Sequence, residues 1–261
     1  MTNTNRGRCR LGIVAALLTL AAGLYAGPPD GAQATRPALR VVITGANRGL
    51  GREFARQFHA AGARVIGTAR RPDAADELKA LGVRVEQLDV TDAESVARLA
   101  SRIGSEPVDI VINNAGIGGR HPSIEQIDGD AVDRIFQVNC LGPMRVTQAL
   151  LPALRKGDRK LVVNITSRLG SIELNEQGGY YGYRESKAAL NMFSRSLARE
   201  LSAEGFTCVV ISPGWVRTDM GGPRAALSPT ESIQGMIAVI NGLTTQDSGG
   251  FFDYRGERLP W

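Results

Sequence analysis

Cysteine and histidine are scarce in this sequence, which has 261 residues but only three cysteines and two histidines. Cys9 lies near the N-terminus, whereas Cys140 and Cys208 stand in segments that read as buried helix or strand, so no disulfide framework is predicted. His59 and His121 are too few and too isolated to match a metal-ligand spacing. We therefore expect neither a disulfide-stabilised fold nor a metal site.

Aromatic residues are also few, at 5% of the chain, whereas glycine is plentiful, with 31 residues. This balance favours helices packed closely on a parallel sheet over a β-sandwich. No repeat with a solenoid period is visible. The net charge of +5 is not clustered, which argues against a nucleic-acid partner. With 43% hydrophobic residues, the chain suits one large α/β domain with a sizeable core.

The first 37 residues differ in character from the rest of the chain. Arginines at positions 6, 8 and 10 precede an uncharged apolar run over residues 11–27, and small residues at 32–34 resemble a cleavage site. This order is typical of a secretory signal peptide, although the run also reaches the short limit for a membrane anchor. We expect a signal or anchor with its linker in residues 1–37, a folded domain in residues 38–261, and an exported or membrane-anchored protein. A cytoplasmic protein whose true start lies near Arg36 is the alternative.

Short apolar runs alternate with amphipathic segments from residue 38 onward. The runs are rich in Val and Ile and mostly lack strict alternation, as expected of a parallel sheet that is covered on both faces. Regular alternation of strand and helix implies right-handed crossovers. The sequence therefore predicts the α/β class, with a single Rossmann-type, doubly wound parallel sheet of about seven strands and helices on both faces. Strands are expected at residues 39–44, 64–69, 83–88, 108–113, 160–166 and 207–212, and helices at residues 50–61, 93–103, 131–154 and 183–202.

A glycine-rich segment joins the first expected strand to the first helix, with the sequence Thr-Gly-Ala-Asn-Arg-Gly-Leu-Gly over residues 44–51. Glycines allow a tight turn and a close approach of the backbone to a pyrophosphate, and the helix N-terminus adds N–H donors and the positive end of its dipole. A glycine trio alone is a weak signal, but its position between strand and helix strengthens it. We expect a dinucleotide here, held by Gly45, Asn47, Arg48, Gly49, Leu50 and Gly51.

The end of the second strand bears on the choice between NAD and NADP. An acidic residue there would accept hydrogen bonds from the ribose 2′-hydroxyl of NAD, but the sequence has Arg70 and Arg71 and no carboxylate before Asp73. The planar guanidinium of Arg70 can pair with the 2′-phosphate of NADP, and Arg48 can do the same from the glycine-rich segment. We therefore expect NADP in preference to NAD.

Tyr183 and Lys187 are four residues apart in the last of the expected helices, so they share one face of it. A free tyrosine, with a pKa of about 10, is a poor acid–base group near neutrality. A neighbouring cation stabilises the phenolate, so we expect Lys187 to lower the pKa of Tyr183. Tyr180 stands four residues before Arg184, and spacing alone does not exclude that pair.

Further short motifs follow the strands in order: Asp89-Val90 after the third, Asn113-Asn114-Ala115-Gly116 after the fourth, and Pro213-Gly214-Trp215-Val216-Arg217-Thr218 after the sixth. With the glycine-rich segment and the Tyr-x-x-x-Lys spacing, they resemble the signatures of the short-chain dehydrogenase/reductase family over nearly all of residues 38–261. Residues 213–222, the Gly-Gly-Tyr-Tyr run at 178–181 and the ending at 253–261 are similar to its carbonyl-reductase-like branch, which includes sniffer and C-factor.

The resemblance implies roles for individual residues. Ser167 is expected to hydrogen-bond the substrate carbonyl and stabilise the developing oxyanion, with Thr166 and Ser171 as nearby alternatives. Asn139 is expected to hold a water that links Lys187 to solvent, unless it is a packing asparagine within a helix. Lys187 should also reach the nicotinamide ribose. The cofactor residues implied beyond the glycine-rich segment and Arg70 are Asp89, Val90, Asn113, Ala115, Gly116, Tyr183, Lys187, Pro213, Gly214, Val216 and Thr218.

The resemblance implies a short-chain NAD(P)-dependent oxidoreductase. The leading hypothesis is the NADPH-dependent reduction of a ketone or aldehyde, or the reverse oxidation of an alcohol, with Tyr183 as general acid/base. A nucleotide-binding signalling protein on the same fold is the alternative from another class, and an isomerase or dehydratase is a third. The 16 positions from Ser167 to Tyr183 indicate a long substrate loop at residues 171–179. The family also implies a homodimer or homotetramer.

Overall fold

The computed structural model describes residues 38–119 and 122–261. The signal or anchor expected in residues 1–37 lies outside these residues. Within the described ranges, no helix is both long enough and apolar enough to cross a membrane.

The described residues form one seven-stranded sheet in which every neighbouring pair is parallel, in the order β3-β2-β1-β4-β5-β6-β7. From β1 the chain builds outward through β2 and β3, and it then returns to place β4 on the other side of β1. Such a reversal leaves a crevice at the carboxyl ends of the strands. The strands are β1 (Arg40–Ile43), β2 (Arg64–Ala69), β3 (Arg84–Gln87), β4 (Ile110–Asn113), β5 (Leu161–Ile165), β6 (Thr207–Ser212) and β7 (Phe251–Asp253).

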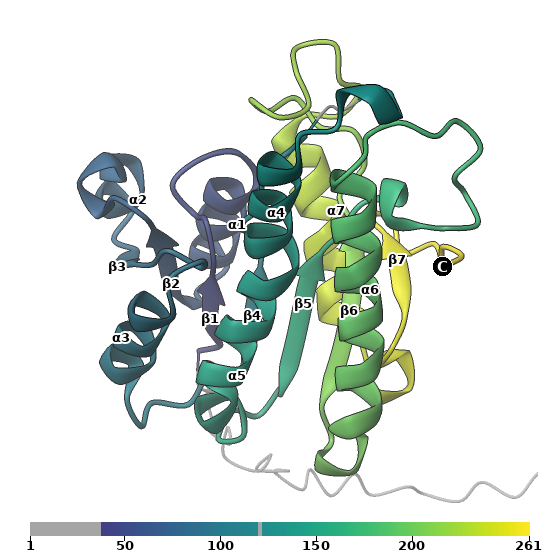
Figure 1. Cartoon of the computed structure of the whole chain (residues 1–261). Coiled ribbons are helices and arrows are strands. Elements are labelled where there is room, and N and C mark those ends of the chain that lie inside the picture. The colour runs from purple at the N-terminus through teal and green to yellow at the C-terminus, as the bar shows by residue number, and fades with distance from the viewer. Residues whose placement is uncertain (1–37, 120–121) are drawn as a thin grey trace, which may run out of the picture. The chain divides into compact units, whose positions relative to one another are not determined.

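Helices cover both faces of the sheet (Figure 1). On one face α1 packs against α7, while on the other α3 packs against α5 and α4 against α6. The helices are α1 (Gly49–Ala60), α2 (Asp76–Ala80), α3 (Ala93–Ile103), α4 (Gly129–Phe136), α5 (Gly142–Leu154), α6 (Tyr183–Glu200) and α7 (Pro229–Gly242). The doubly wound α/β fold expected from the sequence is confirmed.

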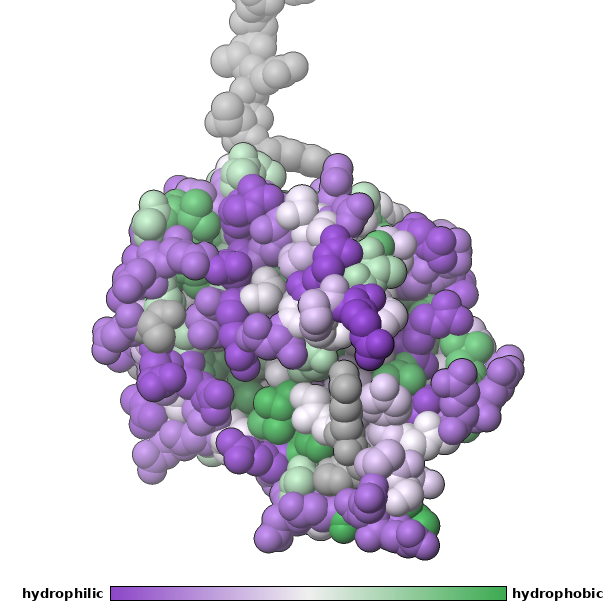
Figure 2. All heavy atoms as spheres, turned by 90° about the horizontal axis from the view of Figure 1, so that it is seen from above, coloured by the Kyte–Doolittle hydropathy of each residue, from purple (hydrophilic) through white to green (hydrophobic). Residues whose placement is uncertain are grey.

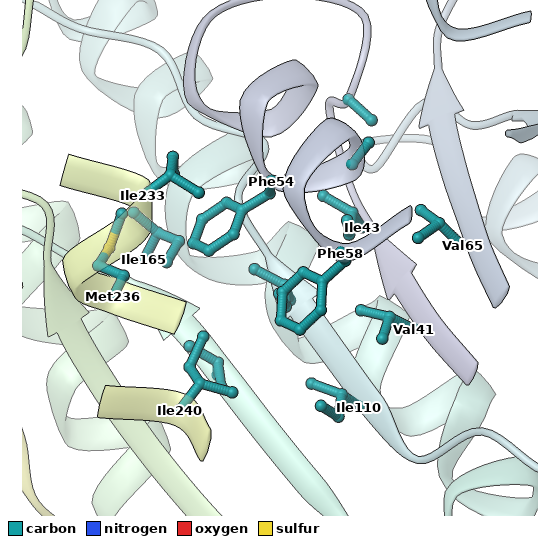
Figure 3. Close-up of a cluster of buried hydrophobic side chains, with 14 of the residues drawn as sticks. Val41, Ile43, Phe54, Phe58, Val65, Ile110, Ile165, Ile233, Met236 and Ile240 are labelled. Carbon is teal, nitrogen blue, oxygen red and sulfur yellow. The ribbon is translucent and has the colours of Figure 1, made fainter. Parts of the chain in front are cut away.

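Successive strand residues contribute to two separate cores, because side chains alternate between the faces of a sheet. Val41 and Ile43 of β1 pack with Phe54 and Phe58 of α1 (Figure 3), whereas Val42 between them belongs to the core on the opposite face. The two phenyl rings stack with centroids 6.2 Å apart. Truncating such a buried Phe to Ala typically costs about 3–5 kcal/mol. This packing fixes α1, and with it the glycine-rich turn at its N-terminus.

The six expected strands agree with the observed ones to within two residues at each end. The expectation of one helix over residues 131–154 is wrong, because α4 and α5 are separated by a π-helical turn, Gln137–Leu141. Pro143 has no N–H to donate to the carbonyl of Asn139, four residues earlier, so the α-helical bonding pattern cannot continue there. α2 and β7 are too short to show a period. α7 mixes apolar residues with Thr230, Ser232, Gln234 and Asn241, so the apolar spacing did not locate it, although the capping box of Ser228 and Glu231 marks its start.

Candidate active site

A cleft of about 1210 Å³ opens where the crossover direction reverses, beyond the carboxyl ends of β1 and β4. Figure 2 views the molecule from this end and shows a mainly hydrophilic surface with smaller apolar areas between. Most of the residues expected at a cofactor line this cleft. They are Gly45, Asn47, Arg48, Gly49, Leu50, Arg70, Asp89, Val90, Ala115, Gly116, Tyr183, Lys187, Pro213 and Thr218.

The glycine-rich turn has a backbone that only glycine accepts readily. Gly45 and Gly49 have φ angles of +65° and +54°, in the left-handed region where a side chain is strained. A Cβ at Gly51 would lie 2.2 Å from the carbonyl oxygen of Gly45, so any side chain there would collide with the turn itself. Gly51 thus packs against the Gly45 carbonyl on the side of the turn that faces away from the cleft, and it does not line the cleft.

A side-chain and backbone network joins this turn to the end of β4. The Thr44 hydroxyl accepts hydrogen bonds from the backbone N–H groups of Asn114 (3.0 Å) and Ala115 (2.9 Å). In return, the Asn114 amide donates to the carbonyls of Thr44 (2.9 Å) and Gly45 (3.2 Å). The Asn-Asn-Ala-Gly motif therefore holds the glycine-rich turn in place.

The N-terminus of α1 opens into the cleft without a side-chain cap. The N-cap residue is Arg48, its side chain makes no capping hydrogen bond, and the first turn holds no acidic residue. Unsatisfied N–H groups at the positive end of a helix dipole suit a phosphate. Arg48 itself lies at the exposed edge of the cleft, where its Nη1 is 2.8 Å from Oδ2 of Asp219. A 2′-phosphate would have to compete with Asp219 for this arginine.

Arg70 and Arg71 both line the cleft at the end of β2, and neither has an ion-pair or hydrogen-bond partner for its side chain among the described residues. Two free guanidinium groups and no carboxylate at this strand end fit a ribose that carries a 2′-phosphate. The uncapped helix, the glycine-rich turn and this pair of cations together fit a dinucleotide.

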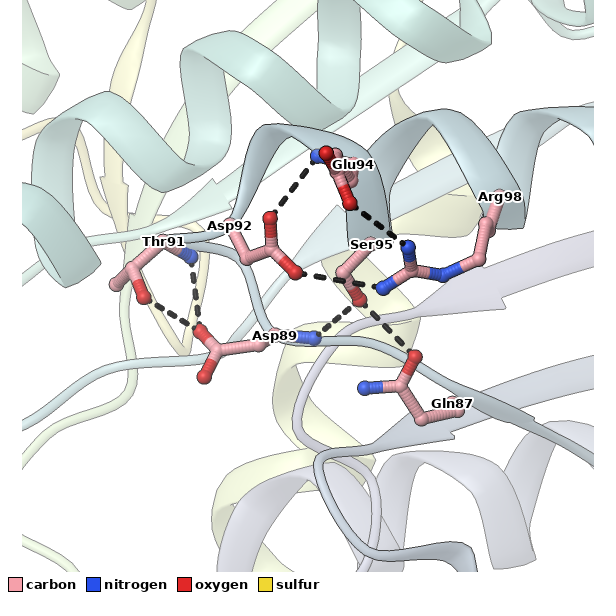
Figure 4. A network of polar contacts seen from close by, with 7 residues as sticks. All are labelled: Gln87, Asp89, Thr91, Asp92, Glu94, Ser95 and Arg98. Carbon is pink, nitrogen blue, oxygen red and sulfur yellow. Dashed lines mark hydrogen bonds and ion pairs between the residues drawn. The ribbon is translucent and has the colours of Figure 1, made fainter.

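Asp89 follows β3 and is held in position by its neighbour Thr91, whose N–H and hydroxyl donate to Oδ1 at 2.9 and 2.7 Å (Figure 4). Its backbone N–H donates to the Ser95 hydroxyl at 2.9 Å. Burial alone raises the pKa of Asp89, but the Thr91 bonds and the charges of Arg70 and Arg134 outweigh it and lower that pKa. Asp89 is therefore an oriented carboxylate in the wall of the cleft.

Three other residues expected at the cofactor do not line the cleft. Asn113 is buried beneath it, where its amide donates to the Thr147 hydroxyl (3.0 Å) and to Asn164 Oδ1 (2.8 Å), so it supports the sheet. Gly214, at φ +80°, packs its Cα against neighbouring side chains. Val216 is buried and forms a β-bridge in the loop after β6. Their motif shapes the loop, and Pro213 and Thr218 are the members that reach the cleft.

Tyr183 and Lys187 lie side by side on the first turn and a half of α6, as the spacing predicts. The chain enters this helix through Gly182, at φ +79°. Lys187 Nζ lies 5.9 Å from the centroid of the Tyr183 ring and donates a 2.8 Å hydrogen bond to the carbonyl of Ile165, the last residue of β5. Lys187 is buried, and it fixes the helix to the end of the strand that leads into Ser167.

The acid–base behaviour of this pair differs from the sequence expectation. Burial raises the pKa of Tyr183, and the hydrogen bond with Ser167 opposes that rise only in part, so the expected lowering by Lys187 is wrong for this structure. Burial lowers the pKa of Lys187 from 10.5 to about 8. The reason is that both groups are taken out of water, which disfavours the phenolate and the ammonium alike.

Ser167 is separated from its two alternatives by what their hydroxyls contact. The Thr166 hydroxyl donates to Asn191 Oδ1 at 2.7 Å, and the Ser171 hydroxyl donates to the backbone oxygen of Trp261 at 3.0 Å. Ser167 instead caps the short turn that follows β5, accepting from the N–H of Leu169 at 3.1 Å. It lies close enough to Tyr183 to oppose the rise in its pKa, although Thr166 and not Ser167 lines the cleft. Of the three, only Ser167 has its hydroxyl at the tyrosine.

Asn139 lies in the π-helical turn and is fully buried. Its Oδ1 accepts from the N–H of Ile117 at 2.9 Å, and its Nδ2 donates to the carbonyl of Ile117 (2.9 Å) and to the Ser186 hydroxyl (3.1 Å). Both Nδ2 hydrogens are therefore used, whereas Oδ1 accepts one hydrogen bond and keeps a second lone pair that could accept from the expected water. These bonds hold the π-helical turn to Ile117 and to Ser186 of α6, so the packing role is observed, and the role in binding a water stays a prediction.

Several lining residues have no motif that the sequence reading used. They are Ala131, Arg134, Ile135, Gln137 and Val138, on and after α4. α4 reaches the cleft only through tertiary packing, so its contribution has no local signal. Tyr180 and Arg184 also make contact, since the guanidinium lies 5.9 Å from the centroid of the Tyr180 ring, but Tyr180 does not line the cleft and Arg184 donates to the carbonyls of Gly179 (3.0 Å) and Gly178 (3.1 Å).

The sequence profile of the short chain dehydrogenase family matches residues 40–227. The chain belongs to the short-chain dehydrogenase/reductase family and is an NAD(P)-dependent oxidoreductase. C-signal from Myxococcus xanthus is 49% identical over 162 residues, which cover 62% of this chain and 98% of C-signal.

Two solved carbonyl reductases share the fold. The carbonyl reductase Sniffer of D. melanogaster has a TM-score of 0.82 at 30% identity. The match covers 86% of this chain and 100% of the Sniffer chain. An NADPH-bound carbonyl reductase from chicken fatty liver has a TM-score of 0.80 at 33% identity. The match covers 86% of this chain and 99% of the reductase chain. Within the family the chain lies in the branch that includes sniffer and C-factor, and its cofactor is NADP or NAD.

Proposed function

We propose that this protein reduces a ketone or an aldehyde to the alcohol with NADPH, and that Tyr183 is the proton donor. The observation that supports this best is that Tyr183 and Lys187 line a cleft that also carries the glycine-rich turn and two arginines, with Ser167 close to Tyr183 just outside the lining. A small-molecule carbonyl compound is the substrate that such a group of residues can activate.

The residues divide the chemistry between them. NADPH supplies a hydride to the carbonyl carbon, and negative charge then develops on the carbonyl oxygen. The phenol of Tyr183 gives its proton to that oxygen, while the Ser167 hydroxyl donates a hydrogen bond to it. The ammonium of Lys187, beside the ring, stabilises the phenolate that Tyr183 becomes.

Substitution of one hydroxyl tests this assignment. Purified full-length protein should consume NADPH with members of a panel of aldehydes and diketones, and Tyr183→Phe should lower kcat by at least about 10³-fold because the proton donor is removed. Tyr180→Phe is the matched control, since it makes the same change three residues away on a tyrosine outside the cleft. Equal turnover by Tyr183→Phe and the unmodified protein would refute the mechanism.

The preference for NADP rests on Arg70 and Arg71. We expect Arg70→Asp to raise the Kd for NADPH by about tenfold or more while changing the Kd for NADH much less, because only NADPH carries the 2′-phosphate that the guanidinium would pair with. Titration of each cofactor by its fluorescence measures both constants. An equal loss for the two cofactors would contradict the role of Arg70.

A signalling protein on the same scaffold is the second candidate, and the similarity to C-signal favours it. The two functions differ in turnover. A signalling protein that only binds the nucleotide should bind NADPH with the affinity of an enzyme and yet leave every carbonyl compound of the panel unchanged. Product analysis of the same reactions separates reduction from isomerisation or dehydration.

Residues 1–37 bear on where the reaction takes place. We propose that they direct export or anchor the chain, because an apolar run follows three arginines. Cell fractionation with N-terminal sequencing of the native protein tests this. A protein in the cytoplasmic fraction that begins near Arg36 would contradict it.

A further inference from the structure

The loop between Ser167 and α6 is held at its start by the far end of the described chain. The backbone N–H groups of Ile172 and Glu173 both donate to the backbone oxygen of Trp261, at 2.6 and 3.1 Å. The Ser171 hydroxyl donates to the same oxygen at 3.0 Å and accepts from the N–H of Leu174 at 3.1 Å. One oxygen atom thus receives three hydrogen bonds from consecutive residues of the substrate loop.

A tight reversal after β7 brings Trp261 to this place. Asp253 is buried, and its Oδ1 accepts from the backbone N–H groups of Arg255 (2.8 Å) and Glu257 (3.0 Å). The chain then runs back along the edge strand, where the N–H of Leu259 donates to the carbonyl of Phe251 at 2.8 Å. Residues 257–261, here called the C-terminal strap, consequently lie beside the substrate loop (Figure 1).

The indole of Trp261 is fixed from two sides. Its ring lies 5.4 Å from the ring of Phe251, centroid to centroid, and the guanidinium of Arg195 on α6 lies 5.3 Å from its centroid. A tilted aromatic pair and a cation–π contact each add order to a side chain at a surface. The strap is therefore anchored to the sheet and to α6 independently of the substrate loop.

The anchored end of the loop lies directly against the candidate active site. Ser171 follows the short turn Arg168–Gly170 that Ser167 caps. A Cβ at Gly170 would lie 2.7 Å from Cβ of Lys187, so this turn packs on α6 at the lysine. The Asn191 amide of the same helix donates to the carbonyl of Gly170 at 3.1 Å. Movement at residues 171–173 would thus reach Ser167 through the three residues of this short turn.

We propose that Trp261 is a positioning residue, through which the C-terminal strap sets the conformation of the substrate loop and the placement of Ser167. This inference rests on the proposed function where it concerns substrate, but the contact itself can be tested without catalysis. Neither the strap nor residues 171–179 line the cleft, so the expected effect on carbonyl binding acts through the placement of Ser167 beside Tyr183, and no effect on NADPH is expected.

Residue-resolved hydrogen exchange tests the contact. In the full chain, removal of Trp261 should speed exchange at the amides of Ile172 and Glu173 by about tenfold or more, because both lose their acceptor. Trp261→Ala should give a smaller increase at the same two amides, and Trp261→Phe, which keeps a ring on Phe251, should restore protection. Met192→Ala, an exposed apolar truncation on α6, is the control for surface damage. If the deletion and Trp261→Ala both leave these two amides at wild-type protection, the proposal is overturned.

Steady-state kinetics then tests the consequence. The deletion should raise KM for a bulky carbonyl compound by about tenfold, change kcat by less than about threefold, and leave the Kd for NADPH unaltered, because a loosened loop weakens substrate binding more than the chemical step. Unchanged KM with lost protection would refute the positioning role. If the unmodified protein reduces no carbonyl compound, the proposed function fails while the exchange result still decides whether the strap holds the loop.

Discussion

Replacement of Lys187 by Met should change the stability of the protein by an amount that depends on pH. Lys187 is buried and its pKa falls from 10.5 to about 8 on folding, because the ammonium leaves water. Between these two values the unfolded chain binds a proton that the folded chain does not. Stability rises with pH wherever the unfolded state binds more protons. The lysine therefore destabilises the fold fully below about pH 8, and this cost disappears as pH approaches the unfolded value.

The magnitude follows from the pKa difference. A shift of 2.5 units, which is 10.5 minus 8, corresponds to about 3 kcal/mol near pH 7. At about pH 10 the remaining cost is less than about 1 kcal/mol. Met has similar length and no charge, but it loses the hydrogen bond to the Ile165 carbonyl, which is worth about 1.5–3 kcal/mol for a charged donor. Near pH 7 the Met variant should thus match the natural protein or exceed its free energy of unfolding by about 1 kcal/mol.

The difference between the two proteins at two pH values is the sharper measurement. Urea unfolding measures the free energy of unfolding of both proteins near pH 7 and near pH 10. From the lower to the higher pH, the natural protein should gain about 2.5 kcal/mol of stability relative to Lys187→Met. The other titrating groups are common to both proteins, so they cancel in this difference. Lys79→Met, on a side chain that is 46% exposed, is the matched control and should show a much smaller change. A difference that stays constant between the two pH values would show that Lys187 does not carry the cost of a buried cation.

Two further substitutions separate roles that lie close together in the fold. Thr166→Val breaks the 2.7 Å bond to Asn191 in a buried site, so it should cost about 1–3 kcal/mol of stability by chemical unfolding without a comparable loss of carbonyl reduction. Ser167→Ala removes the cap on the Leu169 N–H, at a cost of about 0.5–2 kcal/mol, and should lose carbonyl reduction. The reverse pattern would exchange their assignments. Gly51→Ala should abolish NADPH binding in a fluorescence titration, because its Cβ would lie 2.2 Å from the Gly45 oxygen. Binding within about threefold of normal would show that the turn relaxes at little cost.

The buried strands are the part of the fold that the sequence predicts best. β2 and β6 match the expected ranges at both ends, because each is an apolar run bounded by polar or turn-forming residues. The break between α4 and α5 is different, since residues 131–154 keep a helical pattern through it. Only the position of Pro143 relative to Asn139 marks the π-helical turn, and a proline early in a helix is ordinarily unremarkable.

The candidate site shows a similar division. Motif residues predicted the turn, the strand ends and the pair on α6, since each belongs to a short segment with its own chemistry. The pKa of Tyr183 was mispredicted because spacing reports the neighbouring cation but not the burial that both groups share. The role of Trp261 was equally inaccessible, because a contact between residues 90 positions apart has no local pattern.

The altered pKa values of Tyr183 and Lys187 together favour one direction of the reaction. With the pKa of Tyr183 above 10.0 and that of Lys187 at about 8, both groups hold their protons near neutrality. Reduction needs such a proton, whereas oxidation of an alcohol needs a group ready to accept one. Lys187 loses the charge that stabilises the Tyr183 phenolate as pH increases through about 8, so we expect kcat/KM for carbonyl reduction to fall there. Alcohol oxidation needs the phenolate itself, so its kcat/KM should not rise through about 8 but only at higher pH. Initial rates in both directions across this range, with fixed ionic strength, measure the two profiles. Parallel profiles in the two directions would mean that proton loss from this pair does not govern the reaction, and the assignment of Tyr183 and Lys187 as its proton source would then fail.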